Sequence, residues 1–306
     1  MKRKRIFIWL VVCLAVLVGG AGVYAYQVYS NVNQTLESVH QPVRREAIEV
    51  RPEPLELKQL DPVSIVLLGV DERQGDRGRS DSLMLVTVNP NENTTKLVSI
   101  PRDTYVTIEG KGRQDKVNHA YAFGGVPMTL NTLERFLGIP IDYYIEVNMQ
   151  GFQEIVDAVG GVTVHNTFPF SYEGHSFAAG SIPLNGAQAL AYARMRKDDP
   201  KGDFGRQERQ RQVIEAVMKK GASFSSLTHY EDILQVIRQH VRTNLTAAEI
   251  YEMQKDYQQA AQSVEQIEIT GEGKRIGGIW YYVVPEAVRQ QLSNQLRKHL
   301  GLATES

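Results

Sequence analysis

The sequence contains a single cysteine, Cys13, and this residue lies in an apolar N-terminal stretch. The remainder of the chain therefore has no disulfide, no cysteine metal ligand and no thiol nucleophile. The seven histidines are scattered, without a His-x-x-x-His pair, which argues against a zinc site. Charge is nearly balanced, with a net charge of −1 and a pI near 6.7. Because a dedicated nucleic-acid binder carries a broad basic surface, we expect no nucleic-acid partner.

A serine nucleophile is also missing from the sequence. The stretch GHSFA at 174–178 resembles a nucleophile elbow but lacks the final glycine, and Gly180 and Pro183 disfavour the helix that must follow. We expect a surface loop there. The glycine-rich stretch GEGKRIGG at 271–278 joins two predicted strands, so it indicates a hairpin turn and not a phosphate-binding loop.

The N-terminus has the pattern of a membrane anchor. Lys2–Arg5 precede an uncharged, mostly apolar run over 6–26, and about 20 such residues span a bilayer as a helix. Basic residues stay in the cytoplasm, so residues 1–5 form a cytoplasmic tail and the chain after residue 26 lies outside. The alternative is a cleaved secretion signal, but the run is longer than the roughly 7–15 residues of a typical signal core. The prediction is a single-pass, type II protein of the cell membrane.

The part outside the membrane divides into a stalk and one domain. Residues 27–60 are polar with mixed charge and three prolines, which predicts a stalk that begins helical and then extends. From residue 61 to 306, apolar runs of strand length such as SIVLLGV, read as a strand buried on both faces, alternate with helical patterns such as VPMTLNTLERFLG. This alternation predicts an α/β (α+β layered) fold, with a central mixed β-sheet covered by helices.

Two carboxylates flank a polar loop between predicted strands. Asp71 ends the first strand and Asp81 begins the second, so neighbouring strands would bring both to one edge of the sheet. Carboxylates without histidine or cysteine suit a hard divalent ion such as Mg²⁺. Acids that only cap turns remain the alternative from these residues alone.

Basic residues are concentrated in RMRKDDPKGDFGRQERQ, positions 194–210. Arg194 and Arg196 are two apart, which suits an extended segment, whereas Arg206 and Gln210 are four apart and share a helix face. Guanidinium groups bind phosphate through paired hydrogen bonds. The cluster therefore predicts a site for a multiply charged anion, with a salt-bridged helix–loop–helix as the alternative.

The motifs LLGVDERQGDRGRSDSLMLVTVNP, LVSIPRDTYV, DKVNHAYAFGGVPMT and NGAQALAYARMRKDDPKGDFGRQERQRQVI resemble those of the LytR–CpsA–Psr family of cell-wall polymer transferases. The resemblance covers essentially the whole chain. It implies transfer of an anionic glycopolymer from a polyprenyl diphosphate lipid to the 6-hydroxyl of peptidoglycan N-acetylmuramic acid, with release of polyprenyl phosphate. Partners would be the lipid-linked glycopolymer, peptidoglycan and the membrane, and the lipid chain would enter an apolar tunnel between sheet and helices.

The resemblance also implies site residues. Asp71 and Asp81 would hold Mg²⁺ (or Mn²⁺). The pyrophosphate would be bound by Arg79, Arg102, Arg194, Arg196, Arg206 and Gln210, to which we add Lys116. We expect catalytic roles for Arg102, Arg194, Arg196 and Asp203, and the general base is Asp71, Asp81 or Asp203. A diphosphatase acting on the same lipid, or a non-catalytic lipid-binding or regulatory module, are the competing hypotheses.

Overall fold

The computed structural model describes residues 24, 26–46, 48, 51, 53–71, 78–221, 230–260 and 263–304. The tail predicted over 1–5, and the anchor predicted over 6–26 except for Tyr24 and Tyr26, lie outside the described residues. Within these described ranges, no helix combines the length and the apolar character needed to cross a membrane.

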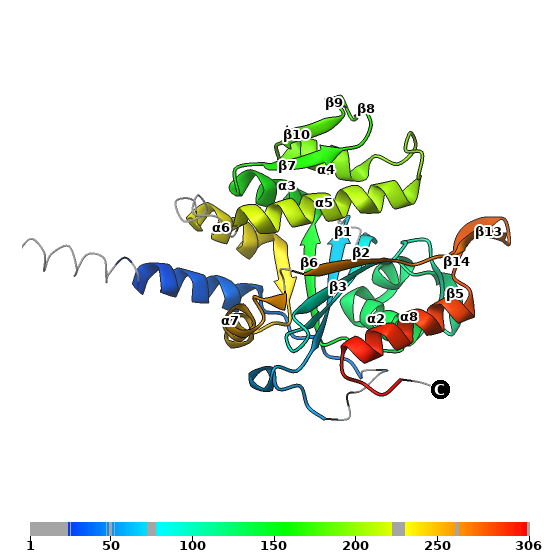
Figure 1. The fold of residues 1–306 in the computed structure, drawn as a ribbon, viewed down its shortest axis with the longest axis horizontal. Coiled ribbons are helices and arrows are strands. Elements are labelled where there is room, and N and C mark those ends of the chain that lie inside the picture. The colour runs from blue at the N-terminus through cyan, green and yellow to red at the C-terminus, as the bar shows by residue number, and fades with distance from the viewer. Residues whose placement is uncertain are drawn as a thin grey trace, which may run out of the picture.

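A six-stranded mixed β-sheet forms the centre of the fold (Figure 1). In order across the sheet, the strands are β11 (Val241–Thr243), β6 (Tyr143–Asn148), β1 (Val63–Val70), β2 (Ser80–Asn89), β3 (Thr94–Ser99) and β12 (Val264–Glu268). Strands β1, β2 and β3 form an antiparallel meander, whereas β6 runs parallel to β1 and β12 runs parallel to β3. The predicted α/β class with a central mixed sheet covered by helices is confirmed.

One face of the sheet packs against two helices, α2 (His119–Leu137) and α8 (Glu286–His299), to form the main hydrophobic core. Alternate side chains along the strands point to this face, as the two-residue period of a strand requires. Gly138 ends α2 in the left-handed conformation, with φ 65°, and a Cβ there would lie 2.6 Å from the hydroxyl oxygen of Ser293 on α8. Glycine at this position thus permits both the helix end and the close approach of the two helices.

The opposite face of the sheet lies under α3 (Met149–Ala158), α5 (Asp203–Gly221) and α7 (Ala247–Asp256). Here the side chains of Leu67, Val86 and Ile145 are only partly buried, because they border a cavity. The prediction that SIVLLGV is buried on both faces therefore holds only in part for this face, where Ile65 is buried but Leu67 is not fully buried.

A group of smaller elements extends the helical side of the sheet, at the top of Figure 1. It contains β7 (Val162–Asn166), β8 (Phe170–Tyr172), β9 (His175–Phe177), β10 (Gly180–Leu184) and α4 (Gly186–Arg194). Helix α6 (Tyr230–His240) lies at the left of the picture and packs against α3. Asn185 caps α4 through a reciprocal capping box with Gln188, as the sequence predicts. The stretch at 174–178, expected to be a loop, instead contributes strand β9 to a hairpin with β8.

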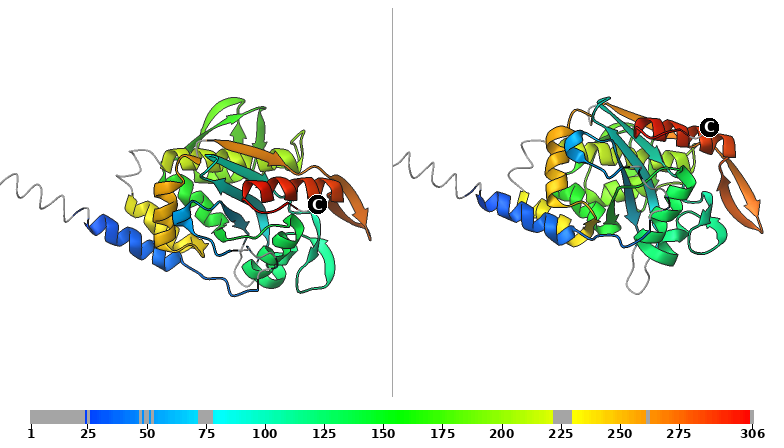
Figure 2. Two further views of the ribbon diagram at one scale, coloured as in Figure 1. Left: turned by 60° about the horizontal axis from the view of Figure 1, so that its bottom comes forward. Right: turned by 90° about the horizontal axis from the view of Figure 1, so that it is seen from below.

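The fold contains two further hairpins, one before and one after this group in the sequence. They are β4 (Tyr105–Ile108) with β5 (Arg113–Lys116), and β13 (Glu272–Ile276) with β14 (Ile279–Val283). The second hairpin, orange in Figure 2, projects beyond the body of the protein. The turn predicted over 271–278 is shorter than expected, since most of that stretch forms β13 and only Gly277 and Gly278 make the bend.

The segment that precedes the sheet lies along the domain. Residues 26–39 are helical, and an extended stretch then leads to the short 3₁₀ helix η1 (Leu57–Gln59). Val39 is buried, and His40 forms a β-bridge with Thr243. Arg45 makes an ion pair with Glu134 of α2 at 2.7 Å. The region predicted as a stalk therefore packs, in large part, against the domain.

Candidate active site

A cavity of about 1830 Å³ lies between the sheet and helices α3, α5 and α7. Along β2 its lining runs from Asp81 to Val88, a stretch of eight residues whose seven steps correspond to roughly 23 Å of strand. Its inner part is apolar, with Leu67, Val86 and Ile145 on the sheet and other aliphatic and methionine side chains on the helices. Its outer part is charged. The cavity thus has the polarity of an elongated molecule with an apolar tail and an ionic head.

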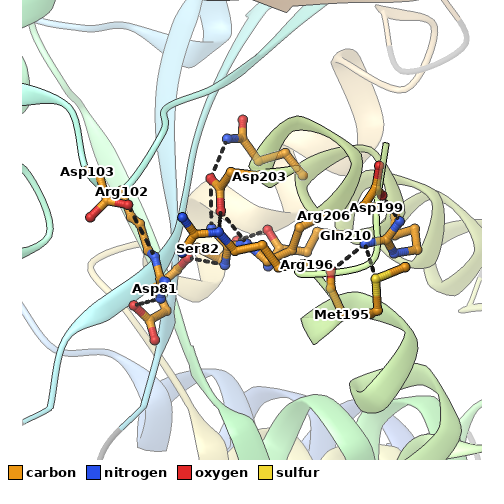
Figure 3. Close-up of polar contacts among 12 residues, drawn as sticks. Asp81, Ser82, Arg102, Asp103, Met195, Arg196, Asp199, Asp203, Arg206 and Gln210 are labelled. Carbon is orange, nitrogen blue, oxygen red and sulfur yellow. Dashed lines mark hydrogen bonds and ion pairs between the residues drawn. The ribbon is translucent and has the colours of Figure 1, made fainter. Parts of the chain in front are cut away.

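The charged end forms where β1 and β3 end and β2 begins. The register of β1 and β2 shifts between Gly69 and Val70, which pair with Ser82 and Ser80, so that Asp81 is an extra residue in the ladder. A bulge of this kind re-aims a side chain, and Asp81 lines the cavity. Its carboxylate accepts a hydrogen bond from Arg102 Nη1 at 2.8 Å (Figure 3).

Arg102 follows β3 and also lines the cavity. Burial disfavours its charge, but the carboxylates of Asp81, Asp103 and Asp203 outweigh burial and raise the pKa of Arg102. Its Nε is buried without a hydrogen-bond partner among the described residues, and lies 4.0 Å from Asp103. Arg102 therefore keeps a fixed positive charge at the mouth of the cavity.

Helix α5 brings a second cation to the same place. Arg206 Nε donates to Asp203 at 2.9 Å, and Arg206 Nη1 donates to the backbone oxygen of Asp81 at 3.0 Å. Arg196 also lies 3.4 Å from Asp203, so one carboxylate holds two guanidinium groups (Figure 3). Although burial opposes it, the neighbouring Arg206, Gln207 and Arg196 lower the pKa of Asp203.

The remaining lining residues from the basic stretch complete the mouth. Arg194 ends α4 and makes an ion pair with Glu173 at 3.0 Å, and Met195 then takes an extended conformation that separates it from Arg196. Gln210 lies one turn after Arg206 and accepts a hydrogen bond from Ser82 at 3.2 Å. Arg194, Arg196, Arg206 and Gln210 all line one cavity, as the spacing predicts. The extended segment predicted for both Arg194 and Arg196 is wrong for Arg194, which is the last residue of α4.

Three predicted site residues lie beside the cavity lining and not in it. Lys116 Nζ makes an ion pair with Asp103 at 2.7 Å, behind Arg102. Asp71 follows β1 and its backbone nitrogen donates to the oxygen of Arg79 at 3.0 Å, so both lie at the same strand edge as Asp81. Arg79 itself is exposed. The predicted placement of Asp71 and Asp81 at one edge is thus correct.

The donor set at this edge fits a hard divalent ion. It consists of carboxylate oxygens from Asp71 and Asp81, which Mg²⁺ accepts in small number when phosphate and water complete its shell. The described residues contain no group of three or more acidic, histidine or cysteine side chains that could hold a metal by themselves. A metal here would therefore need ligands from a bound phosphate.

Arg209 has a structural role that the sequence does not reveal. It is buried away from the cavity mouth. It donates to the Tyr192 backbone oxygen at 2.8 Å, and also to Asp199 and to the Met195 backbone oxygen. Its guanidinium lies 5.4 Å from the ring centre of Phe170. These contacts hold the end of α4 and the loop after it in place, and these two segments carry Arg194 and Arg196.

The chain is similar to known proteins over nearly its whole length. Residues 23–298 match the model of the LytR_cpsA_psr family. A polyisoprenyl-teichoic acid–peptidoglycan teichoic acid transferase, TagU, of Bacillus mycoides is 56% identical over 98% of this chain and 99% of its own. The crystal structure of TagU of Bacillus subtilis is 47% identical, covers 80% of this chain and 100% of its own, and superposes with a TM-score of 0.64.

A structure of TagT bound to LI-WTA is 32% identical, covers 86% of this chain and 100% of its own, and superposes with a TM-score of 0.72. The chain belongs to the LytR_cpsA_psr family, and it is a transferase.

Proposed function

We propose that the protein transfers an anionic glycopolymer, wall teichoic acid, from a polyprenyl diphosphate carrier to the 6-hydroxyl of N-acetylmuramic acid in peptidoglycan. The hydroxyl oxygen bonds to the polymer-side phosphorus, the bond from that phosphorus to the bridging oxygen breaks, and polyprenyl phosphate leaves. The proton of the hydroxyl is released to solvent. The similarity to TagU proteins, which are named as teichoic acid transferases, supports this choice of polymer and acceptor.

The observation that carries the proposal is the polarity of the cavity. Its apolar interior along Leu67, Val86 and Ile145 suits a polyprenyl chain, and its mouth presents Arg102, Arg196 and Arg206 where the diphosphate would lie. A lipid diphosphate has both features within one molecule. The absence of a cysteine outside the predicted anchor also fits, because phosphoryl transfer depends on positioning and charge stabilisation more than on a covalent intermediate.

The residues at the mouth of the cavity have different roles in the proposed reaction. Arg102, Arg194, Arg196 and Arg206, with Gln210, bind the diphosphate and stabilise the negative charge that develops on the departing polyprenyl phosphate. Asp203, whose pKa is lowered, is a weak base, so we assign it to the positioning of Arg196 and Arg206. Arg79 and Lys116 contribute positive charge beside the lining.

We further propose that Asp71 and Asp81 hold Mg²⁺ or Mn²⁺, which supplies positive charge to the diphosphate when bound. Asp81→Asn and Asp71→Asn should then raise the Mg²⁺ concentration needed for half-maximal transfer. The control is Asp198→Asn, an exposed residue of the same charge. An unchanged Mg²⁺ requirement in both site variants would remove these residues as ligands.

The location follows from the same reaction. We propose that residues 6–26 anchor the protein in the cell membrane as a type II single-pass segment, that residues 1–5 are cytoplasmic, and that residues 61–306 form the extracellular catalytic domain. A lipid-linked donor stays in the bilayer, so the catalytic domain must remain close to it.

The decisive experiment mixes the full-length protein in detergent micelles with a polyprenyl-diphosphate-linked glycopolymer and peptidoglycan oligosaccharides, with Mg²⁺ or with a chelator. Mass spectrometry should detect a phosphodiester adduct and polyprenyl phosphate in the presence of the metal. Free polymer phosphate without adduct would indicate a diphosphatase instead. Donor binding without any product, at every acceptor concentration, would indicate a lipid-binding module.

A further inference from the structure

The β13–β14 hairpin carries an aromatic surface at the charged end of the cavity. Four of its residues line the cavity, namely Gly271, Gly273, Trp280 and Tyr282, and we call them the hairpin platform. Trp280 is 38% exposed. A tryptophan this accessible, at the rim of a cavity, is available to a ligand.

The register of the hairpin places the platform on one side of the ribbon. Gly273 pairs with Tyr282, and Arg275 pairs with Trp280. The side chains of Trp280, Tyr282 and Arg275 therefore lie on the same side of the ribbon as Gly273. A Cβ at Gly273 would lie 3.0 Å from the indole nitrogen of Trp280. The missing side chain therefore lets the indole lie directly over the strand, with its other side open.

The platform continues the charged mouth of the cavity. The Tyr282 backbone nitrogen donates to the oxygen of Asp103 at 2.9 Å, next to Arg102. The Tyr282 ring also contacts Phe204 at the start of α5, with ring centres 5.6 Å apart, next to Asp203. A ligand whose charged group lies among Arg102 and Arg206 has the platform as its adjoining surface.

We propose that the hairpin platform binds the sugar next to the diphosphate of the donor, with the sugar ring on the Trp280 indole. Arg275, directly opposite Trp280 and exposed, would then meet a phosphate further along the polymer. An indole offers a sugar an apolar face of matching size, and a guanidinium offers paired donors to phosphate. Arg275 also donates to the Gly278 oxygen at 3.2 Å, which restrains it at the turn.

This inference rests on the proposed function and adds the subsite for the donor sugar. A sugar ring could come from the donor or from the peptidoglycan acceptor, since both are saccharides. The arginine beside Trp280 favours the donor, because the proposed polymer carries phosphate along its length. Experiments that vary donor and acceptor separately distinguish the two.

Binding can be observed without turnover, because the chain has two tryptophans, Trp9 and Trp280. In the full-length Trp9→Phe variant, Trp280 is the only source of indole fluorescence. We expect a change in its emission when a polyprenyl diphosphate bearing a sugar is added, and little change with sugarless polyprenyl diphosphate. The same emission change with both lipids, or with neither although both bind, would overturn the subsite.

Kinetics with matched variants provide the second test. Trp280→Ala should raise the donor KM about tenfold, the scale of one well-packed aromatic contact, with the acceptor KM unchanged. Trp280→Phe should recover part of this loss. Ile279→Ala is the control, because Ile279 is exposed on the other side of the same strand. Arg275→Gln should weaken long polymer donors more than one-sugar donors, whereas Lys274→Gln on the opposite side should not.

The outcomes separate the subsite from the reaction. A raised acceptor KM with an unchanged donor KM would assign the platform to peptidoglycan and overturn the inference. If transfer is not observed at all but the fluorescence still distinguishes the two lipids, the subsite stands and the proposed reaction fails. Thermal unfolding of each variant, compared with Ile279→Ala, controls for loss of the hairpin.

Discussion

Arg196 depends on its fork of N–H groups and not only on its charge. It shares Asp203 with Arg206 and lines the cavity mouth. Arg196→Lys keeps the charge but offers one ammonium, so we expect the transfer rate to fall about 10- to 100-fold, the loss of one or two charged hydrogen bonds. Arg113→Lys is the control, since Arg113 is exposed on β5. Rates within a factor of two of wild type in Arg196→Lys would contradict its role.

Asp203 makes stability depend on pH. Its folded pKa lies below the ordinary value of 3.8, so its contribution to the free energy of unfolding is present above that pH and is lost as pH falls through the folded pKa. We therefore expect Asp203→Asn to destabilise the protein most at neutral pH, and the difference from wild type to shrink below pH 4. Urea unfolding at several pH values measures this difference. A gap that stays constant down to pH 2 would exclude the linkage.

The local placement of a residue can be predicted from the sequence more readily than its role. Guanidinium chemistry and helix spacing place Arg206 and Gln210 on one face, because these are properties of local sequence. Arg209 stands in the same run but is buried against Asp199 and Tyr192. The difference between a ligand-binding and a structural arginine depends on distant elements that pack against the helix, which local sequence does not specify.

Adjacent residues of β2 test the two faces of the sheet. Leu85 is fully buried in the core with α2 and α8, whereas Val86 is partly exposed to the cavity. We expect Leu85→Ala to lower the free energy of unfolding by about 2–5 kcal/mol and Val86→Ala by less than about 1 kcal/mol. Urea denaturation compares them. Equal losses would mean that the cavity face is packed as tightly as the core.

The alternation of elements also shows where prediction from sequence stops. The order of strands and helices follows from hydrophobic periodicity, so the layered fold was predictable. The cavity was not predictable from SIVLLGV alone, because an apolar side chain that faces a lipid looks the same as one that faces a core. The two cases differ in how far α3, α5 and α7 lie from the sheet, which the sequence of one strand does not specify.

The N-terminal segment is part of the folded body. Arg45 donates to Glu134, which is almost fully buried on α2, and to the backbone oxygen of Ile141. Arg45→Ala removes the guanidinium that neutralises this buried carboxylate, so we expect the free energy of unfolding to fall by about 3–5 kcal/mol. Lys58→Ala, at an exposed ion pair, should change it by less than about 1 kcal/mol. Comparable losses in the two variants would argue that the segment is only loosely attached.

The cavity has a consequence for turnover. In the proposed reaction the donor and the by-product carry the same polyprenyl chain, and the apolar part of the cavity would contact both. Substrate and by-product would then differ in the charge that meets Arg102 and Arg206 and in the glycopolymer, which only the donor carries. We therefore expect the release of polyprenyl phosphate into the bilayer to limit the rate of the catalytic cycle. Free polyprenyl phosphate in the membrane would then inhibit the attachment of polymer to the cell wall.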